Sequence, residues 1–181
     1  MIVSSLQEYG IRCCVQLALY ESKGHSTCSS LQISEAEGIS QEYVAKIFHI
    51  LKRKNLVTAT RGSRGGYALS AGAQGTTLLD VVEALIEDGV YDLEKFCSGS
   101  SDEKTHEACE LSSCCQLKPL WETLFSFQKH ILGSLSLSEV TAGNFSEQIQ
   151  QKMQAFQFGN FAPIKNENNK IHLKNIETMR I

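Results

Sequence analysis

The sequence predicts a mostly α-helical protein with a small β-hairpin, arranged as a winged helix-turn-helix followed by a long dimerisation helix. Two short helical patterns, at residues 29–37 and from residue 40 onward, are joined by Gly38 and indicate a helix-turn-helix. A glycine-rich hairpin pattern at residues 56–69 follows and indicates the wing. Apolar residues at alternating four- and three-residue steps from Leu117 onward predict the long helix.

The composition fits a globular chain whose positive charge is local. Its 181 residues are 42% hydrophobic, which is enough to bury a core and excludes a wholly disordered chain. The net charge of −3 is unlike that of a nucleic-acid binder, but residues 1–70 carry +3 and the remainder −6. Six basic residues and no acidic one lie between Lys46 and Arg64, and such a stripe attracts phosphates. A solvated helix face is the alternative that charge alone leaves open.

The hydropathy and the cysteine count predict a cytoplasmic protein without a membrane partner. No apolar run reaches the 18 residues of a membrane span. The start of the chain lacks the basic segment and long apolar stretch of a signal peptide. Seven cysteines, an odd number in such a chain, argue against a complete disulfide framework.

The helices of the predicted helix-turn-helix have clear apolar faces. The first helix runs from Leu6 to about Tyr20, and its Cys13 and Cys14 are interpreted as small core thiols. Residues 21–27 form a polar loop, and Ser40 caps the third helix by accepting a backbone N–H. One face of that helix carries its apolar residues, which are Tyr43, Val44, Ile47, Phe48 and Leu51. The free face is polar and basic, as in a helix that enters the major groove.

The predicted wing carries two arginines on a glycine-rich tip. Residues 56–60 form a strand, residues 61–66 a turn and residues 67–69 a return strand. The three glycines of the turn supply tip conformations that are closed to other residues. Arginines on such a tip suit a narrow minor groove or phosphates. The candidate DNA-binding residues are therefore Ser40, Gln41, Glu42, Tyr43, Lys46, Arg61, Ser63 and Arg64.

The second half of the chain predicts a loop, a long helix and a tail. Thr77 caps a helix that reaches about Glu87, with Asp80 completing a capping box. Irregular polar sequence up to Cys115 predicts a long loop. The apolar seam of the helix that follows comprises Leu117, Trp121, Leu124, Ile131 and Leu135, with Gln128 as its one polar member. A homodimer supplies the partner helix most simply, and packing within the same chain is the alternative.

These elements divide the chain into four parts. Residues 1–88 form the winged helix-turn-helix DNA-binding domain, and residues 89–115 a cysteine-rich cluster-binding loop. Residues 116–157 form the dimerisation helix and a packing segment, and we expect residues 158–181 to be a flexible tail.

Three segments resemble a known family. Ile39–Val44, Leu56-Val57 and Arg61–Leu69 are similar to the Rrf-type family of bacterial winged-helix transcriptional regulators, with members of the IscR, NsrR, RirA and CymR type. The Arg-Gly-x-x-Gly-Gly-Tyr wing is highly specific, and Cys115–Trp121 resembles the family's third cysteine leading into its dimerisation helix. The resemblance covers about residues 1–145 and implies a homodimer on double-stranded operator DNA.

The resemblance also implies an iron–sulfur cluster in the loop. By position its cysteine ligands are Cys97, Cys109 and Cys115. The step from Cys97 to Cys109 is longer than is usual in the family, and Cys114 is an alternative to Cys115. Cys28, placed in the polar loop, has no ligand role. We expect a 2Fe–2S cluster, with 4Fe–4S as the alternative. Thiolates suit both iron and zinc, so spacing alone leaves a zinc site or a thiol switch open.

The fourth ligand is expected to be Glu8 from the opposite subunit. Lys118 stands where IscR-type members have a histidine, and a protonated lysine cannot be a ligand. Glu8 stands where other members take a carboxylate from the first helix. The alternative is that Glu8 is only a first-turn charge that suits the helix dipole.

The expected function is a DNA-binding transcriptional regulator whose operator binding is controlled by a cluster that senses redox, nitric oxide or iron status. The alternative is a cluster-free regulator of the same fold that acts through a thiol switch or a protein partner. An enzyme is not expected, because the chain has no Cys-x-x-Cys motif, Gly-rich nucleotide loop or paired His/Asp constellation. In a pure protein-interaction module the wing arginines would have no purpose.

Overall fold

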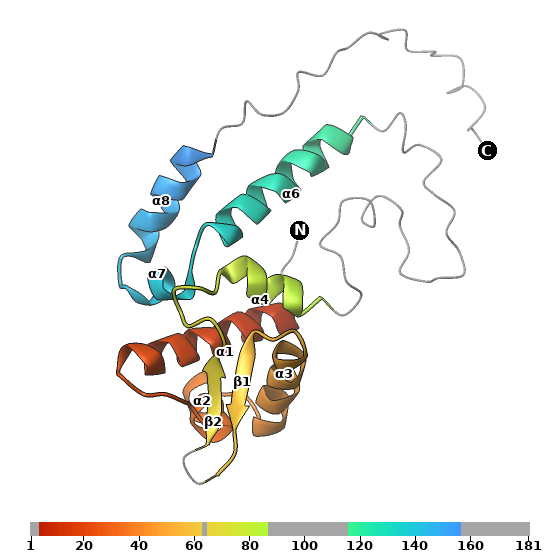
Figure 1. Ribbon diagram of the computed structural model, residues 1–181. Coiled ribbons are helices and arrows are strands. Elements are labelled where there is room, and N and C mark those ends of the chain that lie inside the picture. Colours follow the sequence, from red (N-terminus) through yellow and green to blue (C-terminus); the bar gives the residue numbers. More distant parts are fainter. Residues whose placement is uncertain (1–3, 63–64, 87–115, 157–181) are drawn as a thin grey trace, which may run out of the picture.

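The computed structural model describes residues 4–62, 65–86 and 116–156, which form a winged-helix body and a helical extension (Figure 1). The elements of the body are α1 (Ser5–Ser22), α2 (Ser30–Glu37), α3 (Gln41–Arg53), β1 (Val57–Thr60), β2 (Gly66–Leu69) and α4 (Leu78–Ala84). Those of the extension are α6 (Lys118–Gly133), α7 (Leu137–Thr141) and α8 (Phe145–Ala155). Helices with one hairpin confirm the predicted fold class. Among these residues no helix is long and apolar enough to cross a membrane.

Short polar motifs set the helix ends in the body. The Ser29 hydroxyl accepts the Gln32 backbone N–H at 3.2 Å, and the Gln32 side chain accepts the Ser29 N–H at 2.9 Å, which forms a capping box on α2. Gly38 ends α2 in the left-handed region with a φ of 65°, and Ser40 caps α3, as predicted. The predicted capping box at the start of α4 is also present.

A single apolar core joins the helices of the body. The inward face of α3 is fully buried and consists of Val44, Ile47, Phe48 and Leu51. Cys13 and Cys14 of α1 are 0% exposed in the same core, so their interpretation as core thiols is confirmed. Burial of such side chains contributes about 1.5–3 kcal/mol each, which makes this face the main anchor of α3.

The hairpin is paired with a third segment at its base. β1 and β2 are antiparallel, with Val57 opposite Leu69 and Thr60 opposite Gly66. Cys28 donates its backbone N–H to the Tyr67 carbonyl at 2.9 Å and accepts the Tyr67 N–H at 2.8 Å. Cys28 is 1% exposed and belongs to the core, so the prediction that it lies in a polar loop is wrong. The sequence analysis missed this pairing because the residues before Cys28 are polar and its partner strand lies almost forty positions away.

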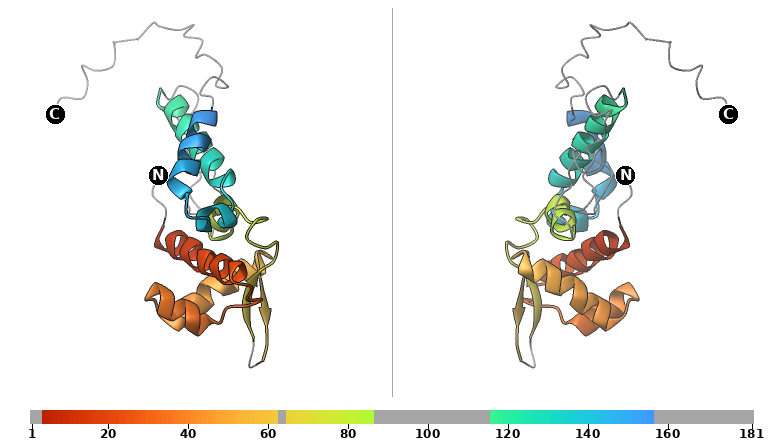
Figure 2. Two further views of the ribbon diagram at one scale, coloured as in Figure 1. Left: turned by 90° about the vertical axis from the view of Figure 1, so that its left-hand side faces the viewer. Right: turned by 90° about the vertical axis from the view of Figure 1, so that its right-hand side faces the viewer.

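The extension joins the body through a second backbone pairing. Leu78 donates to the Leu135 carbonyl at 3.0 Å, and Leu137 donates to the Thr76 carbonyl at 2.9 Å. Gly133 at the end of α6 approaches Leu79 of α4 so closely that a Cβ there would lie 3.2 Å from a Leu79 methyl group. Figure 2 shows α8 running back beside α6, at the end of the molecule opposite the hairpin.

The row of apolar residues predicted for one face of the long helix extends beyond the end of that helix. α6 ends at Gly133, and Leu135 lies beyond it at 1% exposure, packed in the body's core. Leu135 packs in the core where the extension joins the body. Its spacing from the other apolar residues therefore does not place it on a helical seam. No residue of α6 itself is buried in the single chain, and Leu117, just before it, and Leu124 are 55% and 42% exposed.

Candidate nucleic-acid interface

The outer face of α3 is the first component of the candidate interface. Because its inner face is held in the core, the predicted Gln41, Glu42 and Lys46 are all exposed, and His49 lies on the same side. The helix ends with exposed Lys52 and Arg53. Cations near a helix C-terminus are stabilised by the helix dipole, and their charges remain available to phosphate.

Two of the predicted residues on α3 also have structural roles. Ser40 uses its hydroxyl to accept the Tyr43 backbone N–H at 3.2 Å. Tyr43 is only half-exposed, because its ring lies edge-on to that of Tyr9 in α1, with 5.7 Å between the centroids. These contacts hold the start of α3 in place against α1, so both residues have a structural role in positioning α3.

Gln41 is joined to α2 by its side chain. Its Nε2 donates to the Ser30 hydroxyl at 2.9 Å. Ser30 belongs to none of the motifs found in the sequence. Only the packing of α2 against α3 brings it within hydrogen-bonding distance of Gln41. The first turn of α3 is therefore partly organised before any ligand is present.

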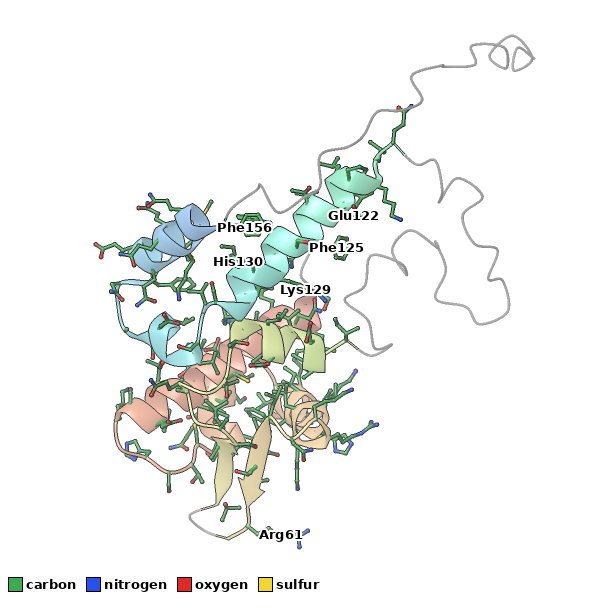
Figure 3. The ribbon with its side chains drawn as sticks, turned by 45° about the horizontal axis from the view of Figure 1, so that its top comes forward. Arg61, Glu122, Phe125, Lys129, His130 and Phe156 are labelled. Atoms are coloured by element: carbon green, nitrogen blue, oxygen red, sulfur yellow. The ribbon has the colours of Figure 1, made fainter. Side chains whose placement is uncertain are left out.

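The hairpin is the second component of the interface. Arg61 is exposed at its far tip, away from the body (Figure 3). Gly62 has a φ of 118°, a conformation that favours glycine, as predicted. Gly65 and Gly66 are needed for a different reason: a Cβ on Gly66 would lie 2.6 Å from the Cys28 carbonyl oxygen, and one on Gly65 would collide with that of Thr60. The other predicted tip residues, Ser63 and Arg64, lie outside the described residues.

The wing and α3 are packed together as one unit. The Tyr67 ring of β2 stacks on the Phe48 ring of α3, with centroids 4.3 Å apart and planes 21° apart. Stacked aromatic pairs contribute about 0.5–1.5 kcal/mol beyond their burial. The stack ties the base of the hairpin to α3, so the two components are packed side by side on one surface.

Glu8 is the one predicted metal ligand that the structure describes. Its carboxylate, 60% exposed, lies 3.7 Å from the Arg12 guanidinium in the first turns of α1. Cys97, Cys109 and Cys115 lie outside the described residues, as does Cys114. Within the described ranges no group of three or more metal-binding side chains occurs. An exposed carboxylate with one loose ion pair is free to accept a further ligand contact.

The described cysteines are buried, neutral thiols. Burial raises the pKa of the Cys13 thiol to about 12, and it raises the pKa of the Cys14 and Cys28 thiols as well. Metal ligation and nucleophilic attack both need the thiolate. All three thiols are almost fully buried in the core, as packing groups are.

Arg12 connects Glu8 to the helix-turn-helix. Its Nε lies 2.6 Å from a carboxylate oxygen of Glu37, at the end of α2, and Gln16 donates to the other oxygen at 2.6 Å. The hydrogen bond and charge of Glu37 raise the pKa of Arg12, so this group stays charged. The four-residue spacing from Glu8 to Arg12 could have suggested that pair from sequence. Glu37 could not have been found this way, because it meets α1 only after folding.

Comparison with known proteins finds similar transcriptional regulators. Residues 3–143 match the model of the Rrf2 family, described as an iron-dependent transcriptional regulator. The chain is 31% identical over 144 residues to the HTH-type transcriptional regulator IscR of Vibrio vulnificus, a match that covers 80% of this chain and 79% of the relative. It is 30% identical over 142 residues to a putative HTH-type transcriptional regulator of Azotobacter vinelandii, covering 78% and 80%.

Two solved structures share the fold. The global cysteine regulator CymR of B. subtilis superposes with a TM-score of 0.58 at 21% identity, covering 78% of this chain and 97% of that one. IscR of T. potens superposes with a TM-score of 0.55 at 20% identity, covering 87% and 92%. At these identities the likeness is one of architecture.

Proposed function

This chain belongs to the Rrf2 family of transcriptional regulators, and from that premise we propose that it binds operator DNA as a homodimer under the control of an iron–sulfur cluster. The family is one of regulators rather than enzymes, as the sequence predicts. The observation that carries the DNA-binding part is the joint surface of α3 and the hairpin, where exposed Gln41, Lys46 and Arg61 stand on rigidly packed elements. The proposed compartment is the cytoplasm.

On DNA, the first turn of α3 is proposed to meet base edges in the major groove. Its N-terminal residues Gln41, Glu42 and Lys46 are the base-reading candidates. The wing, with Arg61, Ser63 and Arg64, is proposed to reach the adjacent minor groove or backbone. The basic C-terminal end of α3 serves phosphates, which position the protein without reading sequence.

The cluster is proposed to be held by Cys97, Cys109, Cys115 and the partner's Glu8. Three thiolates and one carboxylate are a donor set that fits iron, and the carboxylate is the weakest of the four. A 2Fe–2S cluster would supply sensitivity to redox state, nitric oxide or iron supply, with 4Fe–4S as the alternative form. The chain's own contribution at Glu8 is the link through Arg12 to Glu37 in the helix-turn-helix.

The extension supports the proposed homodimer. Leu117, Leu120 and Leu124 are between 42% and 55% exposed along one stretch of chain, which is unusual for leucines. A second copy of α6 would cover them, and a dimer would place two α3 helices at a spacing set by the pair. A ligand crossing between the subunits would connect cluster occupancy with that spacing.

The test is operator binding by protein purified without oxygen. We expect coloured protein that contains iron and sulfide and that selects a specific duplex from genomic fragments. Cys97→Ala and Cys109→Ala should each lose the colour and change DNA affinity, whereas Cys28→Ala should keep both. Selective binding by colourless protein that changes with thiol oxidation would favour the cluster-free alternative. Zinc without sulfide would overturn the iron–sulfur assignment.

Glu8 is tested separately. Glu8→Ala should shorten the lifetime of the colour in air and alter DNA affinity, and Glu8→Asp should lie between this variant and the unchanged protein. If Glu8→Ala keeps the spectrum, the lifetime and the effect on DNA, Glu8 is not a ligand.

A further inference from the structure

A pocket lies beside the base of the hairpin, where Cys28 pairs with β2 on the side away from β1. It has a volume of about 200 Å³ and is formed by the end of α1, the loop at residues 25–28 and strand β2. Leu17 and Leu69 line it with buried apolar side chains, and Tyr20 and Tyr67 are its aromatic members. Pockets for drug-sized ligands measure roughly 300–1,000 Å³, so this one suits a smaller molecule.

The pocket contains a fixed negative charge. Glu21 is the one acidic residue that lines it, and no lysine or arginine does. The Ala73 backbone N–H donates to the two carboxylate oxygens of Glu21 at 3.1 and 3.3 Å. A Cβ on Gly72 would lie 3.1 Å from one of these oxygens, so the glycine leaves room for the carboxylate. A neutral donor holds the group in place without cancelling its charge.

No cation of the described residues neutralises Glu21. The ion pairs of the described carboxylates involve Glu8, Glu37, Glu83 and Glu139. Each oxygen of a carboxylate has two lone pairs, so a single N–H from Ala73 leaves most of the accepting capacity of Glu21 unused. The group is therefore available to a cationic donor from outside the chain.

The other groups around the pocket favour a cation as well. Burial raises the pKa of the Cys28 thiol and is the main cause that raises the pKa of the Tyr20 phenol, so both stay neutral near pH 7. The charge of Glu35 contributes to the raised pKa of Tyr20, so this carboxylate adds negative potential nearby. Lys23 does not line the pocket, but its ammonium lies 6.0 Å from the centroid of the Tyr20 ring, as cations on aromatic faces do.

We propose that this pocket binds a small organic ammonium compound, whose nitrogen contacts the Glu21 carboxylate and whose apolar body lies against Leu17 and Leu69. The inference goes beyond the proposed function and does not depend on DNA binding. An anionic ligand would be repelled by Glu21, and a neutral apolar one would cover the carboxylate without replacing its water. A lone metal ion does not fit, because Ca²⁺ and Mg²⁺ need about six oxygen ligands and one carboxylate supplies too few.

The test uses benzylamine, benzyl alcohol and benzoate, which share one ring and differ in charge. Each is titrated into the purified full chain at neutral pH, and binding is followed by NMR of the backbone amides. Benzylamine should bind with a millimolar or lower dissociation constant, as a ligand of this size can, and should shift the amides of Ser26, Ala68 and Gly72. It should bind about tenfold more tightly than benzyl alcohol, because charge-assisted hydrogen bonds are the stronger ones. Benzoate should not bind.

Glu21→Gln tests the carboxylate. The glutamine keeps an oxygen that can accept the Ala73 N–H but has no charge, so the preference for benzylamine over benzyl alcohol should fall to about twofold or less. Glu147→Gln, at an exposed residue of α8, makes the same change outside the pocket and should leave the preference intact. Thermal unfolding checks that both variants retain the fold. The comparison of the three probes on the unchanged protein needs no variant.

Several outcomes would overturn the inference. Benzoate binding as tightly as benzylamine would exclude an ammonium site, and so would equal binding of benzylamine and benzyl alcohol. Amide shifts confined to the extension would place the ligand elsewhere. A preference for benzylamine that survives in Glu21→Gln would mean that Glu21 is not the binding group. No binding of any probe at tens of millimolar would mean that the pocket is not a ligand site. The proposed function is tested separately, since none of these measurements involves DNA.

Discussion

The body and the extension of this protein differ in how much of their apolar surface is buried within the chain. In the body, α3 buries a complete face, and the Phe48 and Tyr67 rings are stacked within the chain. In the extension, α6 has sixteen residues and buries none of them in the single chain. Among the described residues, the body buries its apolar face within one chain, whereas the leucines at the start of the extension stay exposed. The difference fits the proposed function, in which each chain carries a preformed candidate interface and a homodimer sets the spacing between two of them.

The largest expected effect is on the core of the body. Phe48→Ala should lower the free energy of unfolding by about 3–5 kcal/mol, because it leaves a cavity and removes the stack on Tyr67. Urea unfolding followed by circular dichroism measures this. Leu31→Ala, at a leucine of α2 that is 51% exposed, is the control and should change stability by less than about 0.5 kcal/mol. A loss below about 1 kcal/mol for Phe48→Ala would contradict the claim that the body is the rigid part.

The next effect concerns assembly. Leu120→Glu combined with Leu124→Glu should raise the dimer dissociation constant about a hundredfold, because two charges would enter an apolar contact. Sedimentation velocity over a range of protein concentrations measures the dissociation. Leu31→Glu adds a charge at an equally exposed leucine of the body and should leave the dimer intact. A double variant that dimerises as the unchanged protein does would place the interface away from this stretch.

A moderate effect is expected at the wing. Arg61→Ala should weaken binding to the selected duplex by about 1–3 kcal/mol if the arginine contacts a base edge in the groove. If it contacts phosphate instead, the loss should be similar for all sequences and the salt dependence should fall by about one unit. Titrations at several salt concentrations distinguish the two modes. Unchanged affinity after Arg61→Ala together with Arg64→Ala would remove the wing from the interface.

The smallest effect is expected at α7, where the two regions meet. The Ser136 backbone N–H donates to Glu139 at 2.9 Å, and this bond, with help from Lys152 at 3.4 Å, lowers the pKa of the Glu139 carboxyl. A carboxyl whose pKa is lower in the folded state stabilises the fold above its unfolded pKa, and that contribution is lost as the pH falls through the folded value. Glu139→Gln should therefore cost less than about 1 kcal/mol near neutral pH and almost nothing in acid.

Glu147→Gln, at an exposed residue of α8, controls for the change in net charge. Unfolding midpoints for the three proteins across the acidic range give the comparison. A difference for Glu139→Gln that persists unchanged into acid would mean that the charge of Glu139 is not what stabilises α7.

Local chemistry determined much of this protein from sequence alone. Ser40, Gly38 and the box at Thr77 act within a few residues of themselves, so the helix starts and stops could be predicted from neighbours. The buried face of α3 follows from its helical period, and the hairpin from its glycines. Apart from half-exposed Tyr43, the candidate DNA-binding residues that are described, Gln41 and Arg61 among them, are exposed because these local patterns place them there.

Tertiary structure decided what depends on segments far apart in the chain. Leu135 has a helical spacing but serves the joint with Leu78, and Cys28 follows polar residues but pairs with Tyr67. The contact of Arg12 with Glu37 is of the same kind. Each joins residues separated by tens of positions, and the spacing of residues along one segment carries no information about such partners. Only the packing of the finished fold brings these groups within hydrogen-bonding distance.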